Sequence, residues 1–198
     1  VMRSAAQLLE RSLESKDSET KELLLMLREE VDRIDHVVTG LLELGRPREL
    51  TLEPVPLGQV VFRAADFAEM QAREHGVVIR RVAAEPDPTA LCDPELVYQV
   101  VLNLLVNALQ ILSAGGQIEI AVARPAGGVV GFHVRDDGPG IPEAIREKIF
   151  QPFFSQRAGG AGLGLTFVQR VVQEHRGRVT VESTPGRGTT FRIELPAA

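Results

Sequence analysis

The segment PELVYQVVLNLLVNALQIL, residues 94–112, is almost entirely apolar and is interrupted by two asparagines, Asn103 and Asn107. Asp93, directly before Pro94, is typical of a helix start. A short acidic side chain caps free backbone N–H groups there, and proline fits the first turn. We therefore predict a buried helix over the whole segment.

The two asparagines lie four residues apart and so share one face of this helix. A buried amide lowers stability unless it finds a hydrogen-bond partner. In one interpretation, both are core residues that cap neighbouring backbone groups. In the other, they offer a pair of oxygen ligands to a hard cation such as Mg²⁺ and to the phosphates bound to it. The helix alone leaves both interpretations open.

Two glycine-rich segments follow. DDGPG, residues 136–140, comes after a predicted strand, and its first residue, Asp136, could accept a hydrogen bond from an exocyclic amine. An ordinary Asp-Gly turn has the same sequence. GGAGLGL, residues 159–165, runs directly into a predicted helix, and free N–H groups at a helix N-terminus suit phosphates. It is neither a Walker loop, since no lysine follows, nor a Rossmann turn, since no strand immediately precedes it.

The chain from residue 50 onward alternates helices with strands that are mostly joined as hairpins. This pattern predicts an α+β fold, a two-layer sandwich in which helices cover one face of a mixed sheet. Strands are predicted over 50–55, 77–82, 116–123, 129–135, 178–183 and 189–195, and helices over 57–74, 94–112, 142–150 and 163–175.

Residues 1–46 predict an antiparallel helical hairpin, which Gly45 and Pro47 end. Its second helix, over about 20–44, carries a heptad seam that needs partner helices. The first helix is only about 21 Å long against about 37 Å for the second, so we expect its missing part upstream. Because two helices bury little, we expect a homodimer to complete a four-helix bundle. The second domain is then 47–198.

The composition excludes several classes of protein. The net charge of −5 argues against nucleic-acid binding, because no basic excess neutralises phosphates. The single cysteine, Cys92, allows no intrachain disulfide, which favours a reducing compartment and a packing role for this residue. No apolar run approaches the ~20 residues of a membrane span. We therefore expect a cytoplasmic chain without membrane contact, although a membrane-anchored sensory part could lie upstream.

Taken together and in order, these segments resemble the conserved boxes of the catalytic domain of sensor histidine kinases. That domain has the Bergerat ATP-binding fold, which gyrase, Hsp90 and MutL ATPases share. The resemblance spans roughly residues 50–196, and the hairpin resembles the second part of the dimerisation and phosphotransfer domain. It implies transfer of the ATP γ-phosphoryl group to a histidine and relay to a response-regulator aspartate. The matching boxes are the N box 103–108, G1 box 136–141, F box 149–154, G2 box 160–165 and last glycine box 186–189.

The resemblance also implies a role for each matched residue. Asn107 is expected to bind the Mg²⁺ that bridges the phosphates, with Asn103 supporting the phosphate side. Asp136 is expected to accept from the adenine amino group, and Thr189 to share a water there. The segment 153–159 is expected to be a mobile ATP lid. The other expected nucleotide contacts are Gly138, Gly140 and Ile141 near the base, and Gly160, Gly162, Leu163 and Gly164 around the phosphates.

Some positions depart from the family's pattern. Arg157 stands where a lysine is frequent, and we expect it to act at the phosphates as a catalytic residue. Gln110 replaces a basic residue, and Ala161 replaces a threonine or serine, which removes one hydroxyl donor. Asn103 stands where the hydrolytic gyrase, Hsp90 and MutL ATPases have a glutamate that activates water. A hydrolytic ATPase therefore remains an alternative that its chemistry disfavours, and a regulatory pseudokinase or dimerisation scaffold is another.

The largest departure concerns the phosphoacceptor. The family's motif is a histidine followed at once by an acid, which serves as its general base. None of the four histidines, His36, His75, His133 and His175, has an acid after it. His36 is on the predicted hairpin, and His75 and His175 lie at predicted helix ends, where a histidine cation suits the helix dipole. We expect the phosphoacceptor to lie upstream of Val1.

Overall fold

A computed structural model of the chain describes Val31 and residues 50–124, 127–156 and 160–198. The rest of the predicted hairpin and the predicted catalytic residue Arg157 lie outside these residues. No helix within the described part is long and apolar enough to cross a membrane.

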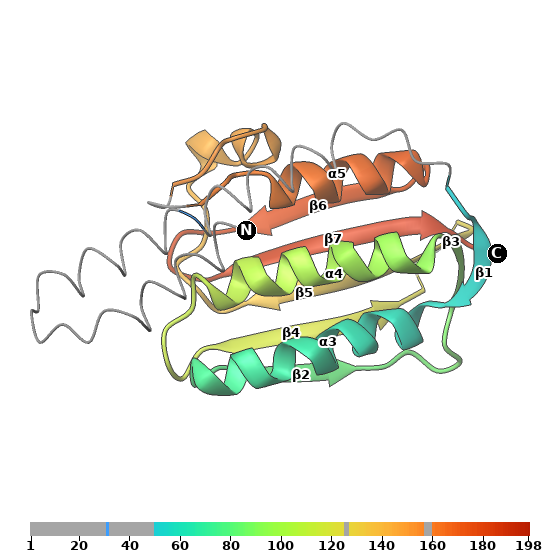
Figure 1. The fold of residues 1–198 in the computed structure, drawn as a ribbon, viewed down its shortest axis with the longest axis horizontal. Coiled ribbons are helices and arrows are strands. Elements are labelled where there is room, and N and C mark those ends of the chain that lie inside the picture. The colour runs from blue at the N-terminus through green and yellow to red at the C-terminus, as the bar shows by residue number, and fades with distance from the viewer. Residues whose placement is uncertain (1–30, 32–49, 125–126, 157–159) are drawn as a thin grey trace, which may run out of the picture.

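The main sheet has five strands in the order β2-β4-β5-β7-β6. β2 pairs parallel with β4, and every other pair in this sheet is antiparallel. Three α-helices lie side by side on one face (Figure 1). This arrangement confirms the predicted α+β sandwich with a mixed sheet. The strands are β2 (Val78–Val82), β4 (Gln117–Ala123), β5 (Val129–Asp136), β6 (Arg178–Ser183) and β7 (Thr189–Pro196); the helices are α3 (Leu57–Glu74), α4 (Pro94–Leu109) and α5 (Gly164–Glu174).

A second, two-stranded sheet pairs β1 (Glu53–Pro56) with β3 (Thr89–Cys92). The sequence pattern does not predict β3, because four residues after a proline-rich loop are too few to show an alternation. That loop also contacts the start of α3, where Leu57 N–H donates to the Pro88 carbonyl at 2.9 Å. The N-cap of α3 is a proline without a capping side chain. Asp87 substitutes for the cap by accepting the N–H of Gly58 at 2.9 Å.

Two predicted helices end differently in the structure. α4 stops at Leu109 and not near Leu112, because the amides of residues 111 and 112 both donate to the Ala108 carbonyl and tighten the last turn. The helix predicted over 142–150 is two short 3₁₀ turns, η1 (Glu143–Ile145) and η2 (Lys148–Phe150). Propensity alone does not separate such turns from an α-helix.

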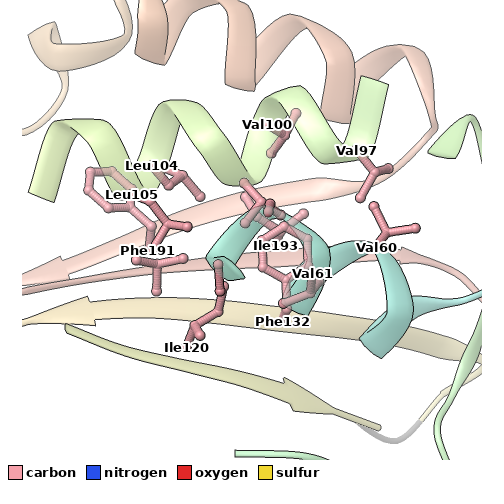
Figure 2. Packing of buried hydrophobic residues seen from close by; sticks show 14 of the residues in the cluster. Val60, Val61, Val97, Val100, Leu104, Leu105, Ile120, Phe132, Phe191 and Ile193 are labelled. Atoms are coloured by element: carbon pink, nitrogen blue, oxygen red, sulfur yellow. The ribbon is translucent and has the colours of Figure 1, made fainter. Parts of the chain in front are cut away.

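The core lies between the helices and the sheet, as Figure 2 shows. Cys92 belongs to it, and burial raises the pKa of its thiol to about 11, which fits the predicted packing role. This interface holds α4 and α5 on the sheet and thereby fixes the ends of the elements that carry the glycine-rich boxes. The residues that Figure 2 labels are Val60 and Val61 of α3, Val97, Val100, Leu104 and Leu105 of α4, and Ile120, Phe132, Phe191 and Ile193 of the sheet.

Candidate nucleotide-binding site

Asn103 lies on α4 beside the start of α5. Its side-chain amide donates to the Gln99 carbonyl at 2.9 Å, one turn back along the helix. Its Oδ1 lies 2.8 Å from the point where a Cβ of Gly164 would stand. The amide nitrogen therefore bonds the backbone of its own helix, as the structural interpretation expects. The amide oxygen faces the glycine turn. Asn107 is half-buried one turn further along the same face.

Asp136 ends β5 and lies opposite Thr189 of β7 in the sheet register. The two residues are only 5% and 4% exposed. Asp136 Oδ1 accepts the N–H of Gly138 at 2.9 Å. Burial raises the pKa of Asp136, and backbone N–H groups of Gly138 and Thr189 oppose this shift. The ion pairs of the described residues do not include Asp136, so amide donors hold a buried carboxylate that can accept from a further N–H group.

This burial predicts a pH dependence of stability. Because the pKa of Asp136 is raised on folding, the folded chain holds this proton more tightly than the unfolded chain. The free energy by which the protonated Asp136 stabilises the fold is fully present below the ordinary pKa of aspartate. It is lost as the pH rises through the raised pKa of the folded chain. Asp136→Asn removes the titration, so its stability relative to wild type should increase from pH 4 to pH 7. Urea unfolding of both proteins across this range measures it, and a constant difference would refute it.

Ser183, which the sequence analysis does not single out, joins the loop after β5 to the turn between β6 and β7. Its Oγ accepts the N–H of Ile141 at 2.7 Å and donates to the Gly188 carbonyl at 3.0 Å. The same oxygen lies 3.0 Å from Thr189 Oγ1, and Arg146 Nη2 donates to the Ser183 carbonyl at 2.9 Å. A serine at a strand end carries no signal for this role in the sequence.

Gly140 lies where the same loop meets the β6–β7 turn. Its φ is +72°, in the left-handed region that favours glycine. A Cβ at this position would overlap the carbonyl oxygen of Thr184. A hydrogen bond from Gly186 N–H to the Pro139 carbonyl, at 2.7 Å, holds the contact closed.

Gly140→Ala should therefore destabilise the domain by at least about 2 kcal/mol, from backbone strain and the steric overlap together. Gly127→Ala is the control, because Gly127 also has a positive φ but a Cβ there meets nothing within 4 Å. Urea unfolding compares the two variants, and equal losses of stability would contradict the predicted close approach.

The G2 turn is joined to the F box. Phe153 N–H donates to the Gly162 carbonyl at 3.0 Å. Gly162 has φ +66°, and a Cβ there would lie 2.6 Å from the carbonyl carbon of Phe153. Thr166 Oγ1 donates to the Phe150 carbonyl at 3.0 Å, and the Phe150 ring stands edge-on to core residue Phe191. Described residues on either side of the predicted lid are thus hydrogen-bonded to each other.

α4 connects the two halves of this site. Its middle reaches the start of α5 through Asn103, and residues 111 and 112 after its end lie 3.4 Å from a Cβ position at Gly138. Ile141 packs against the core. Leu163 is 5% exposed, so a phosphate could meet its backbone but not its side chain. The structure thus brings Asn103 to Gly164 and the end of α4 to Gly138, while Arg157 lies outside the described ranges.

The described residues hold no group of three or more histidine, cysteine, aspartate or glutamate side chains that could bind a metal ion. A pocket of about 410 Å³ lies elsewhere, between α3 and residues 83–87, and no predicted site residue lines it.

Comparison with known proteins bears on this arrangement. The family model described as "Histidine kinase-, DNA gyrase B-, and HSP90-like ATPase" matches residues 92–198, more than half of the chain. The chain belongs to this family. The sensor histidine kinase ZraS of Klebsiella oxytoca is 37% identical over 184 residues, which are 91% of this chain and 39% of that protein. The sensory histidine kinase/phosphatase NtrB of Rhodobacter capsulatus is 37% identical over 98% of this chain and 57% of its own length. The family member described here thus spans only part of these relatives.

Solved structures agree with the family assignment. Full-length ShkA in complex with AMPPNP matches all of this chain, and 42% of its own, with a TM-score of 0.80 and 32% identity. Histidine kinase ThkA in complex with the response regulator protein TrrA matches 98% of this chain and 56% of its own, with a TM-score of 0.79 and 26% identity. The predicted resemblance to sensor histidine kinases is confirmed.

Proposed function

We propose that this chain is the ATP-binding catalytic part of a two-component sensor histidine kinase. It binds ATP with Mg²⁺ and delivers the γ-phosphoryl group to a histidine, from which a receiver aspartate takes it. One observation carries the proposal: α4 joins the buried Asp136–Thr189 pair, through the G1 loop, to the glycine turn that opens α5. These features suit an adenine base and a row of phosphates.

In this proposal, Asp136 recognises the base by accepting from the adenine amino group, in the position that the buried carboxylate already holds. Gly138, Gly140 and Ile141 form the loop beside the base. The N–H groups and positive dipole end of α5 receive the phosphates. Holding the base and the phosphates at separate points of the site positions the γ-phosphoryl group, which is the main requirement of phosphoryl transfer.

The donor set at Asn107 fits Mg²⁺, because hard cations prefer oxygen ligands and Mg²⁺ often combines few protein ligands with phosphates. Asn107 would hold the ion through its amide oxygen. Mg²⁺ supplies neutralisation of the phosphate charge. Asn103 supports the phosphate side, and Arg157 is proposed to act there as well.

The chemistry of Asn103 favours transfer over hydrolysis. A hydrolytic relative needs a carboxylate at this position to take a proton from water. An amide cannot take that proton, and the amide nitrogen of Asn103 is bonded to the Gln99 carbonyl. Water is therefore not activated at this position.

The wider assembly also belongs to the proposal. We place the chain in the cytoplasm, as a homodimer through the hairpin 1–46 and with a response-regulator receiver domain as its partner. The complex of histidine kinase ThkA with the response regulator protein TrrA supports this choice of partner by similarity.

A chimera tests the kinase proposal. The complete phosphoacceptor hairpin of a sensor histidine kinase replaces residues 1–46, and the protein is incubated with γ-labelled ATP and Mg²⁺. We expect acid-labile label on the grafted histidine of the chimera. The unaltered chain, incubated in the same way, should take up no label, because none of its histidines has an adjacent acid. ATP binding without label would favour the scaffold alternative, and steady hydrolysis without label would favour the hydrolytic ATPase.

A further inference from the structure

α4 and α5 lie side by side and run antiparallel (Figure 1). They contact each other at both ends of the pair. At the nucleotide end, Asn103 Oδ1 stands against Gly164. At the far end, Asp93 before α4 meets His175 after α5. The two contacts lie about 15 Å apart along the helices, at 1.5 Å per residue.

His175 is 2% exposed, and both of its ring nitrogens are hydrogen-bonded. Nε2 lies 2.9 Å from the backbone nitrogen of Asp93, and Nδ1 lies 2.7 Å from the Val171 carbonyl oxygen. Because a backbone N–H can only donate, Nε2 must accept, and Nδ1 must carry the hydrogen that it donates to Val171. Both ring nitrogens are thus used, one as a donor and the other as an acceptor.

Asp93, whose N–H donates to His175, also makes hydrogen bonds through its own side chain. Its Oδ1 accepts the N–H groups of Glu95 and Leu96, both at 3.1 Å, and so begins α4. Its Oδ2 accepts the N–H of Thr51 at 3.3 Å, from the segment that enters the domain. A bond from His175 to this residue thus fixes the end of α5 to the first turn of the helix that carries Asn103.

His75, which follows the last residue of α3, can be compared with His175, because both histidines stand at the end of a helix. His75 Nδ1 bonds the Gln71 carbonyl at 2.8 Å, the same local contact four residues back that His175 makes to Val171. His75 is exposed, and no bond from it to another helix is found among the described residues. The two histidines share the local helix-end contact, and His175 adds the contact between helices.

We propose that His175 is a positioning residue for the nucleotide site. By fixing the far end of the α4–α5 pair, it sets the separation between the asparagine face of α4 and the glycine turn of α5, and thereby the affinity for the triphosphate. The inference rests on the nucleotide site proposed above. The two helices approach each other closely at this end, since a Cβ at Gly164 would lie 2.8 Å from Asn103 Oδ1.

Three substitutions of His175, to Gln, Asn and Phe, distinguish the effects of its two hydrogen bonds. Gln places its amide where Nε2 stands and can still accept from Asp93, whereas Asn reaches only the Val171 carbonyl. Phe fills the volume and makes neither bond. His75→Phe is the matched control, since it removes a local helix-end bond alone. Affinities of each variant for ATP and for adenosine, with Mg²⁺, are measured by calorimetry, and stability is measured by urea unfolding.

We expect His175→Asn and His175→Phe to weaken ATP binding by at least about threefold, as substitutions along a coupled contact do. His175→Gln and His75→Phe should stay within about twofold of wild type. Adenosine affinity should change less than ATP affinity, because Asp136 and Thr189 lie on β5 and β7 and not between α4 and α5. A folded His175→Asn with wild-type ATP affinity would overturn the inference, and so would an equal loss in His75→Phe. A wild-type chain that does not bind ATP would instead overturn the proposed function.

Discussion

Asn107→Ala is expected to lower phosphoryl transfer by about a hundredfold or more, the usual cost of removing a group that stabilises charge in the transition state. The physical reason is the loss of the amide oxygen assigned to Mg²⁺. The described residues offer no cluster of acidic, histidine or cysteine ligands to replace it. Labelling of the chimera with γ-labelled ATP measures the rate, and calorimetry measures the binding of ATP with and without Mg²⁺.

Asn107→Asp is the informative companion to this variant. It keeps an oxygen at the same place and adds a negative charge, so it should retain more Mg²⁺-dependent binding than Asn107→Ala. Unfolding in urea shows whether either variant remains folded. Wild-type transfer by a folded Asn107→Ala protein would remove Asn107 from the metal site.

Asp136→Asn is expected to weaken ATP binding by roughly 10- to 100-fold, because a charged acceptor contributes about 1.5–3 kcal/mol to a hydrogen bond. The substitution keeps the shape of the side chain and an acceptor for Gly138. It places an N–H₂ group against the adenine amine, so that two donors face each other. The same variant should be the more stable one at neutral pH without nucleotide, since burial raises the pKa of Asp136.

The neighbouring aspartate provides the control. Asp137 is exposed and accepts the N–H of Gln117 at 2.8 Å. Asp137→Asn should therefore bind ATP as wild type does. If the two substitutions weaken ATP binding equally, the assignment of the base to Asp136 is wrong.

Much of this fold and site could be predicted because the signals are local. The helix over 94–112 follows from Asp93, a proline and a long apolar run, and α4 begins where these residues place it. The glycine segments mark positions where a side chain collides, as Gly140 and Gly162 do. Their order along the chain then identifies the family, which the comparison confirms.

Other features depend on contacts that no local pattern encodes. Asp87 caps α3 from 29 residues away, and Ser183 meets Ile141, 42 residues earlier in the sequence, only when the loop after β5 packs against the β6–β7 hairpin. The bond between His175 and Asp93 joins residues that lie 82 positions apart in the sequence. The sequence shows which groups are present, but only the packed structure shows which of them meet.

A calorimetric titration of ATP and of GTP, each with Mg²⁺, into the chain tests the central claim most directly. We expect saturable binding of ATP at one site per chain. Binding of GTP should be much weaker, because its base carries a carbonyl where adenine has its amine, and Asp136→Asn should lose this preference for ATP. No saturable binding of ATP, or equal binding of both nucleotides, would contradict the central claim.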